Sequence, residues 1–289
     1  MAARPKACSL PRSAATLRER CVGAIWESDN AEMYALASLF MLGEIEELSR
    51  RLPRLLERAE ERGNLLAARY LRVGCFSHVA WLAADDADGA RRELALGVAP
   101  SRNVFDFTQI WLRGALRDIA LYTGEGLEEA APIREGWRRA ARALDRFPQA
   151  GLILSLFSRA RRRVALGAAA ATPEAVRAHL DQADRYADDL LSQRAAWGEA
   201  LGLLVRAGSA ATRGRRERAL EAVTQAAARL DAVDMALFAV AARRGQGELL
   251  GGEAGRAQVA EADAWMAAQA IRRPDRMARM LAPGAWRPA

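Results

Sequence analysis

Apolar residues recur at three- and four-residue steps along much of the chain, which is the spacing of an amphipathic α-helix. The clearest example alternates six apolar positions with Arg and Glu; they are Ile45, Leu48, Leu52, Leu55, Leu56 and Ala59. This pattern predicts one buried stripe on a helix that ends near Gly63 and is kinked at Pro53. Few β-branched runs are available to form strands, so we expect an all-α protein.

The same pattern repeats as pairs of helices separated by Gly or acidic turns. Asp85, Asp86 and Asp88 are candidate N-caps of one helix, and Thr172 followed by Pro173 is typical of a helix start. The expected pairs cover residues 31–42 with 45–59, 65–84 with 90–98, 105–122 with 127–144, 152–165 with 173–190, 197–212 with 220–230, and 235–250 with 259–266.

Glycines between the paired helices set a repeat length near 40 residues. They are Gly43, Gly124, Gly167, Gly214 and Gly252, separated by 81 (two units), 43, 47 and 38 residues. This period predicts a right-handed α-solenoid of about six antiparallel helix pairs, in which each pair is buried against its neighbours. An irregular helical bundle is the alternative.

The expected domain organisation has three parts. We expect a disordered tail over residues 1–16, the helical-repeat domain over 17–270, and a C-terminal capping segment over 271–289. The last segment caps the array through the Trp265 helix and through apolar residues that fold back. Those residues are Ile271, Met277, Met280 and Leu281.

The net charge of +7 raises nucleic acid as a partner. Lys6 is the only lysine, however, so 42 of the 43 basic residues are Arg, which indicates a GC-rich coding bias at least as strongly. We therefore favour a solvated charged surface and consider nucleic acid unlikely. The densest basic positions are Arg161, Arg162 and Arg163, and then Arg213, Arg215 and Arg216.

Catalytic motifs are largely excluded by residue types. A Walker A loop and a protein kinase both need a lysine at the phosphates, and Lys6 lies in the expected tail. Gly245, Gly247 and Gly251 miss the dinucleotide-binding spacing and fall in an expected helix. Neither HExxH nor GxSxG is present, and two histidines do not make a usual zinc site. We expect no enzyme activity, no cofactor and no metal.

Cysteine usage and hydropathy indicate a cytoplasmic chain. Cys8, Cys21 and Cys75 are odd in number and form no CxxC motif, which fits a reducing compartment. No export signal or uncharged apolar run of 18 residues is present, so we expect no membrane association.

Three weak candidate features have structural interpretations that we favour. Cys75 and His78 could form a thiolate–imidazole pair, but a hydrogen-bonded core histidine beside a buried thiol is the favoured interpretation. His179 is expected at the surface or paired within its own helix. An acidic face made of Asp181, Asp184, Asp188 and Asp189 is expected to be solvated, with weak cation binding as the second interpretation.

Tryptophans are the candidate partner-binding residues. Trp81, Trp111, Trp137 and Trp197 fall on apolar stripes, which favours packing between helices. The functional alternative is an aromatic lining of a concave groove that receives a peptide.

The segments "ALASLFMLGEIEELSRRL" and "ALRDIALYTGEGLEEAAPI" resemble tetratricopeptide-type units: a small-residue helix, a Gly-acidic turn and an amphipathic helix. The stretch from Ala242 to Gly284 is more specific. It is similar to the C-terminal tail of large bacterial serine/threonine protein kinases fused to an AAA-type ATPase module. "LRERCVGAIWESDNAEMYALASLFMLGEIEELSRR" and "VAWLAADD" resemble earlier parts of that tail.

The resemblance implies an interaction role without transferring a catalytic residue, because no position here matches the kinase or ATPase motifs. We expect a non-catalytic protein–protein interaction or regulatory module in bacterial serine/threonine kinase signalling. Its partner would be a protein or peptide, including kinase or ATPase domains in cis or in trans. The chain would be either a detached segment of a larger kinase or a separate adaptor. The alternative is a basic helical-repeat nucleic-acid-binding protein that uses the Arg clusters, with affinity that falls steeply with salt.

Overall fold

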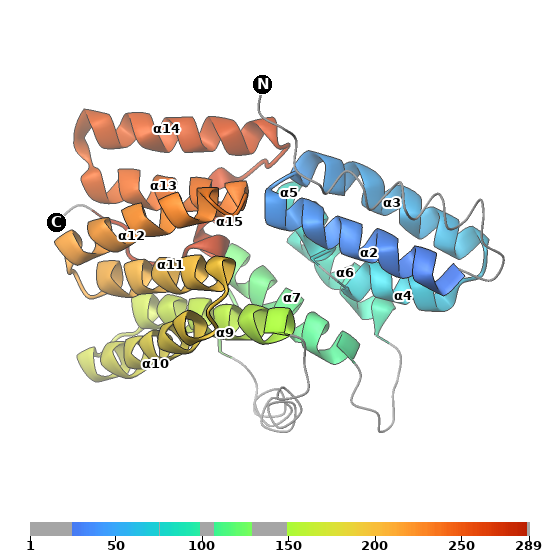
Figure 1. Ribbon diagram of the computed structural model, residues 1–289, viewed down its shortest axis with the longest axis horizontal. Coiled ribbons are helices and arrows are strands. Elements are labelled where there is room, and N and C mark those ends of the chain that lie inside the picture. Colours follow the sequence, from blue (N-terminus) through green and yellow to red (C-terminus); the bar gives the residue numbers. More distant parts are fainter. Residues whose placement is uncertain (1–24, 75, 99–106, 129–148, 288–289) are drawn as a thin grey trace. The chain divides into compact units, whose positions relative to one another are not determined.

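The computed structural model describes residues 25–74, 76–98, 107–128 and 149–287 (Figure 1). Within these ranges thirteen helices and no strands are present, as expected for an all-α protein. The chain divides into two compact units, Met1–Ala115 and Leu116–Ala289, with the boundary inside helix α7. The expected tail at 1–16 and the expected helix at 127–144, except for its first two residues, lie outside the described residues.

The first unit contains α2 (Ile25–Leu42), α3 (Ile45–Glu61), α4 (Leu65–Val73), α5 (His78–Ala83), α6 (Ala87–Gly97) and the beginning of α7 (Phe107–Thr123). Helix α3 packs against α2, α4 and α5, and α4 also packs against α6. The six apolar residues of the predicted α3 stripe are all buried, which confirms that prediction. Helix α3 continues through Pro53, and Gly43 and Gly63 take positive φ at its two ends.

The expected single helix over residues 65–84 is wrong. Helix α4 ends at Val73, Phe76 has φ of 69°, and α5 begins only at His78. The Phe76 ring stacks on Phe40 of α2 with centroids 4.2 Å apart. A Cβ at Gly74 would also lie 3.2 Å from the Met33 sulfur. Tertiary packing against α2 therefore accompanies a break that local helix propensity does not predict.

The second unit contains the end of α7 and then α9 (Gln149–Ala169), α10 (Pro173–Ser192), α11 (Ala196–Thr212), α12 (Arg216–Asp231), α13 (Ala236–Leu250), α14 (Gly252–Ala268) and α15 (Pro274–Leu281). From α9 to α14 each helix packs against the next, and α9 also contacts α11 (Figure 1). Helix α11 has ten buried residues whereas α12 has five. The first helices of the pairs, α9, α11 and α13, therefore form the inner layer of this unit.

Two predicted N-caps are confirmed. The Asp86 carboxylate accepts a hydrogen bond from the Gly89 backbone N–H at 2.7 Å. The Thr172 hydroxyl accepts one from the Ala175 N–H at 3.2 Å, with Pro173 at the start of α10. Short polar side chains at these positions satisfy backbone donors that a helix leaves open at its N-terminus.

Gly167 does not separate two helices, contrary to expectation. It is buried inside α9, where a Cβ would lie 2.7 Å from Leu180 Cδ2 of α10. Its missing side chain therefore permits close packing between α9 and α10, and the chain turns after Ala169 instead. The other four predicted turn glycines, at positions 43, 124, 214 and 252, all have positive φ.

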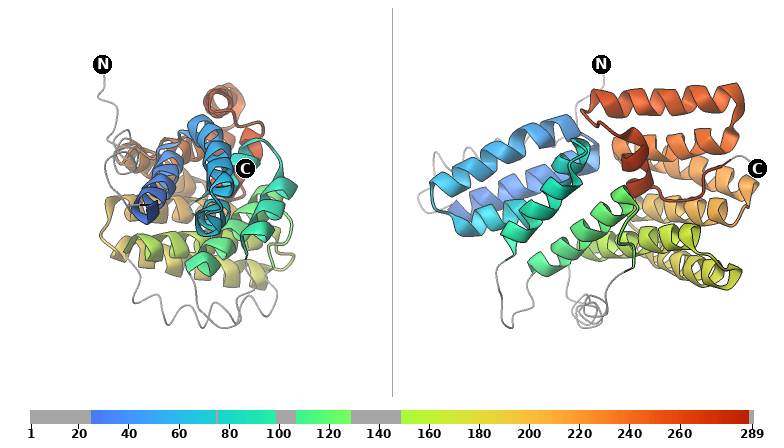
Figure 2. Two further views of the ribbon diagram at one scale, coloured as in Figure 1. Left: turned by 90° about the vertical axis from the view of Figure 1, so that its right-hand side faces the viewer. Right: turned by 180° about the vertical axis from the view of Figure 1, so that it is seen from behind.

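The predicted back-folding of the chain end is confirmed by the burial of Ile271, Met277, Met280 and Leu281. Helix α15 packs against α13 and α14, and the Met280 carbonyl accepts a hydrogen bond from Arg161 of α9. The end of the chain thus extends across the inner layer rather than covering only the last pair (Figure 2, right). Among the described residues, no helix has both the length and the apolar composition needed to cross a bilayer.

Candidate functional site

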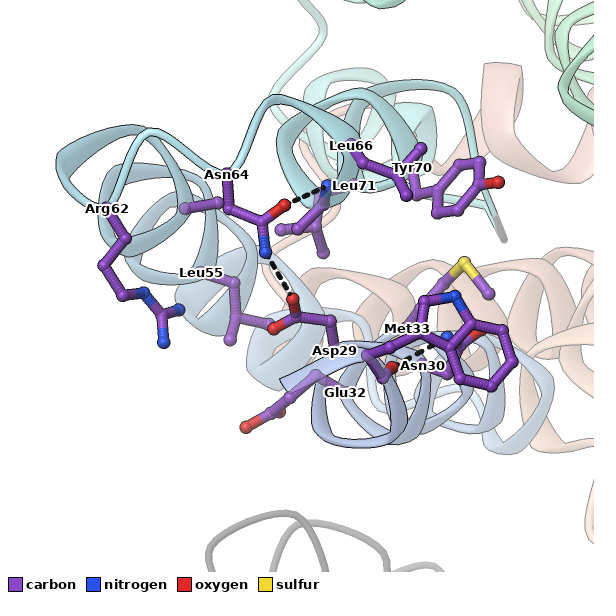
Figure 3. A pocket seen from close by; sticks show the side chains of 13 residues that line it. Asp29, Asn30, Glu32, Met33, Leu55, Arg62, Asn64, Leu66, Tyr70 and Leu71 are labelled. Carbon is purple, nitrogen blue, oxygen red and sulfur yellow. Dashed lines mark hydrogen bonds between the residues drawn. The ribbon is translucent and has the colours of Figure 1, made fainter. Parts of the chain in front are cut away.

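A cleft of about 320 Å³ lies between α2, α3 and α4 in the first unit (Figure 3). Its floor is apolar and buried, and consists of Met33, Leu55, Ala59, Ala67 and Leu71. A volume of this size is at the lower end of the range for small-ligand pockets, and it suits one or two apolar side chains.

Large apolar side chains also border the cleft on the solvent side. Trp26, in the first turn of α2, is 62% exposed, and Leu66, in the first turn of α4, is 48% exposed. The half-buried Tyr70 lies one helical turn beyond Leu66. Exposed apolar groups that adjoin a buried apolar floor are typical of a surface that binds another molecule, because binding removes their apolar area from water.

Asn64 connects two walls of the cleft. Its side-chain amide donates to the Asp29 carboxylate of α2 at 2.7 Å, and its side-chain oxygen caps α4 by accepting from the Ala67 N–H at 3.1 Å (Figure 3). Both polar ends of this side chain are therefore used, which fixes the start of α4 relative to α2.

The rim carries an excess of negative charge on the α2 side. Asp29 and Glu32 line the cleft from α2, and Arg62 lines it from the end of α3. Helix α2 also carries Glu27 and has no basic residue. Charge complementarity at this rim favours a ligand with basic groups beside its apolar part.

Of the four predicted tryptophans, Trp81 and Trp111 belong to the first unit and Trp197 belongs to the second. Trp111 stands behind the cleft wall, with its ring edge-on to Tyr70 at 6.0 Å. Trp81 packs at Gly89 of α6, where a Cβ would lie 2.7 Å from its ring, and Trp197 is half-buried on α11 of the other unit. Trp137 lies outside the described residues.

Trp26 is an aromatic residue of the cleft that the sequence interpretation missed, because the first helix was expected to start at residue 31. The helix starts at Ile25 instead. Trp26 precedes Met33 by seven residues, two helical turns, so extending the apolar stripe backwards would have placed Trp26 on the same face as Met33.

The interpretation of the Arg161–Arg163 cluster as solvated surface is wrong for two of its members. The Arg161 guanidinium is 2.8 Å from the Asp118 carboxylate, and both side chains are buried, 7% and 4% exposed. Arg162 is also buried and donates to the Leu127 carbonyl at 2.6 Å. These arginines pair with groups distant in sequence, which a charge pattern does not reveal.

The acidic face of α10 pairs with α11 instead of being only solvated. Arg213 lies 2.7 Å from Asp181 and 2.9 Å from Asp184, and Arg206 lies 2.6 Å from Asp188. In the second Arg cluster, Arg213 is thus neutralised. Arg216 donates to the carbonyls of Leu249 and Leu250.

His179 pairs with the neighbouring helix and not within its own. Its Nδ1 is 3.0 Å from Arg163 Nη1 of α9, so the imidazole is the hydrogen-bond acceptor and must be neutral at this nitrogen. Desolvation lowers the pKa of His179, the positive charges of Arg163 and Arg162 lower it too, and Glu128 opposes the shift.

This shift predicts a pH-dependent stability. Because the pKa of His179 is lower in the folded chain, stability is fully present above the ordinary histidine pKa of about 6.5 and is lost as pH falls through the folded value. We expect urea unfolding to show a smaller decrease in stability between pH 7.5 and pH 5.5 for His179→Gln than for the wild type. Equal decreases in both proteins would contradict the assignment.

The Cys75 and His78 pair is not placed, because Cys75 lies outside the described residues. The interpretation assumed that both lie on one helix, and the break at Phe76 makes that assumption wrong. His78 is buried in the core, as the favoured interpretation expected. In the part of the chain that the structure describes, no group of three or more His, Cys, Asp or Glu residues is arranged to hold a metal.

The cleft between α2, α3 and α4 thus combines a buried apolar floor, two exposed apolar side chains and an acidic rim, and these features suit non-covalent recognition. Comparison of the chain with protein-family models, with curated proteins and with solved structures finds no match.

Proposed function

We propose that the chain is a non-catalytic protein-interaction module, and that its cleft between α2, α3 and α4 receives an apolar side chain from a basic segment of a protein partner. The observation that carries this proposal is the exposure of Trp26 and Leu66 beside a buried apolar floor. Tryptophan is among the residues that most often dominate binding energy at protein interfaces.

The acidic rim specifies the partner further. The carboxylates that line the cleft outnumber its single arginine, Arg62, so Arg or Lys next to the inserted side chain would complement the charge of the rim better than a neutral segment would. An exposed pair of this kind contributes only about 0–1 kcal/mol, so the apolar insertion supplies most of the affinity and the charges supply orientation.

The same proposal includes the finer fold and the biological setting. Pairwise packing of successive helices and positive-φ glycines at their turns support a tetratricopeptide-like right-handed solenoid of about six helix pairs. The resemblance to kinase tails supports a regulatory role in bacterial serine/threonine kinase signalling. Kinase or ATPase domains, in cis or in trans, are then the first partners to test.

The experiment measures binding of labelled synthetic peptides to the full chain by fluorescence anisotropy. The peptides are helical 15-residue sequences that carry one Trp or Leu flanked by arginines. We expect Leu66→Ser to weaken binding about tenfold or more, because the substitution removes an apolar side chain that borders the cleft. A tenfold loss of affinity corresponds to about 1.4 kcal/mol. Leu96→Ser, on α6 and 68% exposed but outside the cleft, is the matched control and should change affinity less than twofold.

Two results would overturn the proposal. One is equal weakening by Leu66→Ser and Leu96→Ser, and the other is the absence of binding to every peptide of the set. The nucleic-acid alternative is tested in the same assay with a labelled single-stranded oligonucleotide. Binding of that probe that falls by orders of magnitude between 50 and 200 mM salt would favour the alternative.

A further inference from the structure

The end of the chain lies on the inner layer of the second unit and is held there through backbone groups. Arg161 of α9 donates to the Met280 carbonyl at 2.7 Å, and Arg279 donates to the Tyr122 carbonyl at 3.2 Å. The Thr212 hydroxyl of α11 accepts from the Ala285 N–H at 3.2 Å. We call residues Pro274–Arg287 the C-terminal segment.

Two glycines of the inner layer allow this segment to pack closely against α11 and α13. A Cβ at Gly208 of α11 would lie 2.2 Å from the Pro283 carbonyl oxygen, and a Cβ at Gly245 of α13 would lie 2.9 Å from the Trp286 ring. The first contact is with backbone, so no side-chain rotation would relieve it. The absence of side chains at these two positions makes room for Pro283 on α11 and for the Trp286 ring on α13.

The apolar part of the segment is fully inserted. Met277, Met280 and Leu281 share one face of α15 and have no measurable exposure, and Trp286 is 8% exposed. The Trp286 indole N–H donates to the Ala282 carbonyl at 2.7 Å, so the segment satisfies this polar group internally. The indole N–H is therefore hydrogen-bonded within the segment and needs no partner from α9, α11 or α13.

The helices of the unit pack against one another in chain order from α9 to α14, and the segment is added across them. It is joined through a short connection in which Ala270 has φ of 58° and both Ala270 and Arg272 are exposed. We propose that the face of α9, α11 and α13 is a peptide-binding groove, and that the C-terminal segment is its ligand in cis.

This inference concerns the second unit and stands independently of the cleft in the first. A segment held in cis acts at a high effective concentration, about millimolar for a short connection, so it outcompetes free peptide. The intact chain should therefore not bind the segment as a peptide. Cutting the connection should make exchange possible.

The experiment uses the full chain with a specific protease site inserted after Ala270. After cleavage, a fluorescent peptide of residues 271–289 is added and its anisotropy is followed. We expect the peptide to exchange into the cut protein and not to bind the uncut protein. A peptide with Trp286→Ala should bind at least tenfold more weakly, and one with Arg287→Ala, at an exposed position, should bind within twofold of the original.

A second variant tests the groove itself. Gly208→Ala in the cut protein should weaken the unmodified peptide by tenfold or more, while circular dichroism keeps the helix content. Loss of helix content on cleavage alone would overturn the proposal, because the segment would then be an inseparable part of the core. Equal peptide binding by cut and uncut protein would overturn it too, as would an unchanged affinity for the Trp286→Ala peptide.

Discussion

Replacing Asp118 with Asn is expected to lower the free energy of unfolding of the second unit by about 3–5 kcal/mol. The substitution keeps the size of the side chain but removes the charge that lies 2.8 Å from Arg161. Arg161 is buried, so its guanidinium would lie in the interior without the carboxylate that pairs with it. Urea unfolding followed by circular dichroism measures the loss.

The matched control removes both charges. In the double variant Asp118→Leu with Arg161→Met, both charges of this pair are removed and neither is left without the other, so we expect a much smaller loss of stability than in Asp118→Asn. The remaining cost includes the hydrogen bond from Arg161 to the Met280 carbonyl, about 1 kcal/mol. A loss below 1 kcal/mol for Asp118→Asn alone would show that the ion pair is not buried in solution.

Local signals in the sequence predicted the elements that depend on neighbouring residues. The stripe of α3 and the caps at Asp86 and Thr172 each rest on positions within one or two turns of helix. Burial of one face and satisfaction of terminal N–H groups are properties of a single helix, so the spacing of residue types is sufficient to predict them.

Features that depend on distant residues were not predictable from spacing. Glycine is a residue type typical of turns, yet Gly167 lies inside a helix, where α10 approaches it closely. Arginine is a residue type typical of charged surfaces, yet Arg161 is buried and pairs with Asp118, 43 residues away in the sequence. In both cases the residue type is compatible with two environments, and only the packing of another helix decides between them.

The candidate site lies between these two cases. The sequence predicted a helix at each of the three walls of the cleft, although it started α2 too late and joined α4 to α5, and Trp26 was within reach of a longer periodicity. The cleft itself depends on Asn64, whose hydrogen bond to Asp29 joins residues 35 positions apart. Sequence therefore predicts the helices that border the cleft but not the gap between them.

Replacing Trp286 with Ala is expected to lower the free energy of unfolding of the second unit by about 3–5 kcal/mol, the usual range for truncating a buried aromatic side chain. The ring fills the space over Gly245 and is 8% exposed, so its loss leaves a cavity or releases the chain end. Urea unfolding gives the loss of stability. Trp26→Ala is the control: it removes an indole that is 62% exposed, and should change stability by no more than about 0.5 kcal/mol.

Limited proteolysis of the Trp286→Ala variant shows whether the substitution leaves a cavity under a segment that stays bound or releases the C-terminal segment. If the C-terminal segment is a separable ligand, the Trp286→Ala chain should be cut within residues 272–287 while α9–α14 stay resistant, because the weakened segment leaves the groove before the helices unfold. The loss of stability then has an upper limit, the free energy with which the segment binds in cis. Cleavage spread evenly over α9–α14 would instead show that ring and helices unfold as one cooperative unit, and a loss below 1 kcal/mol would show that the indole does not anchor the chain end.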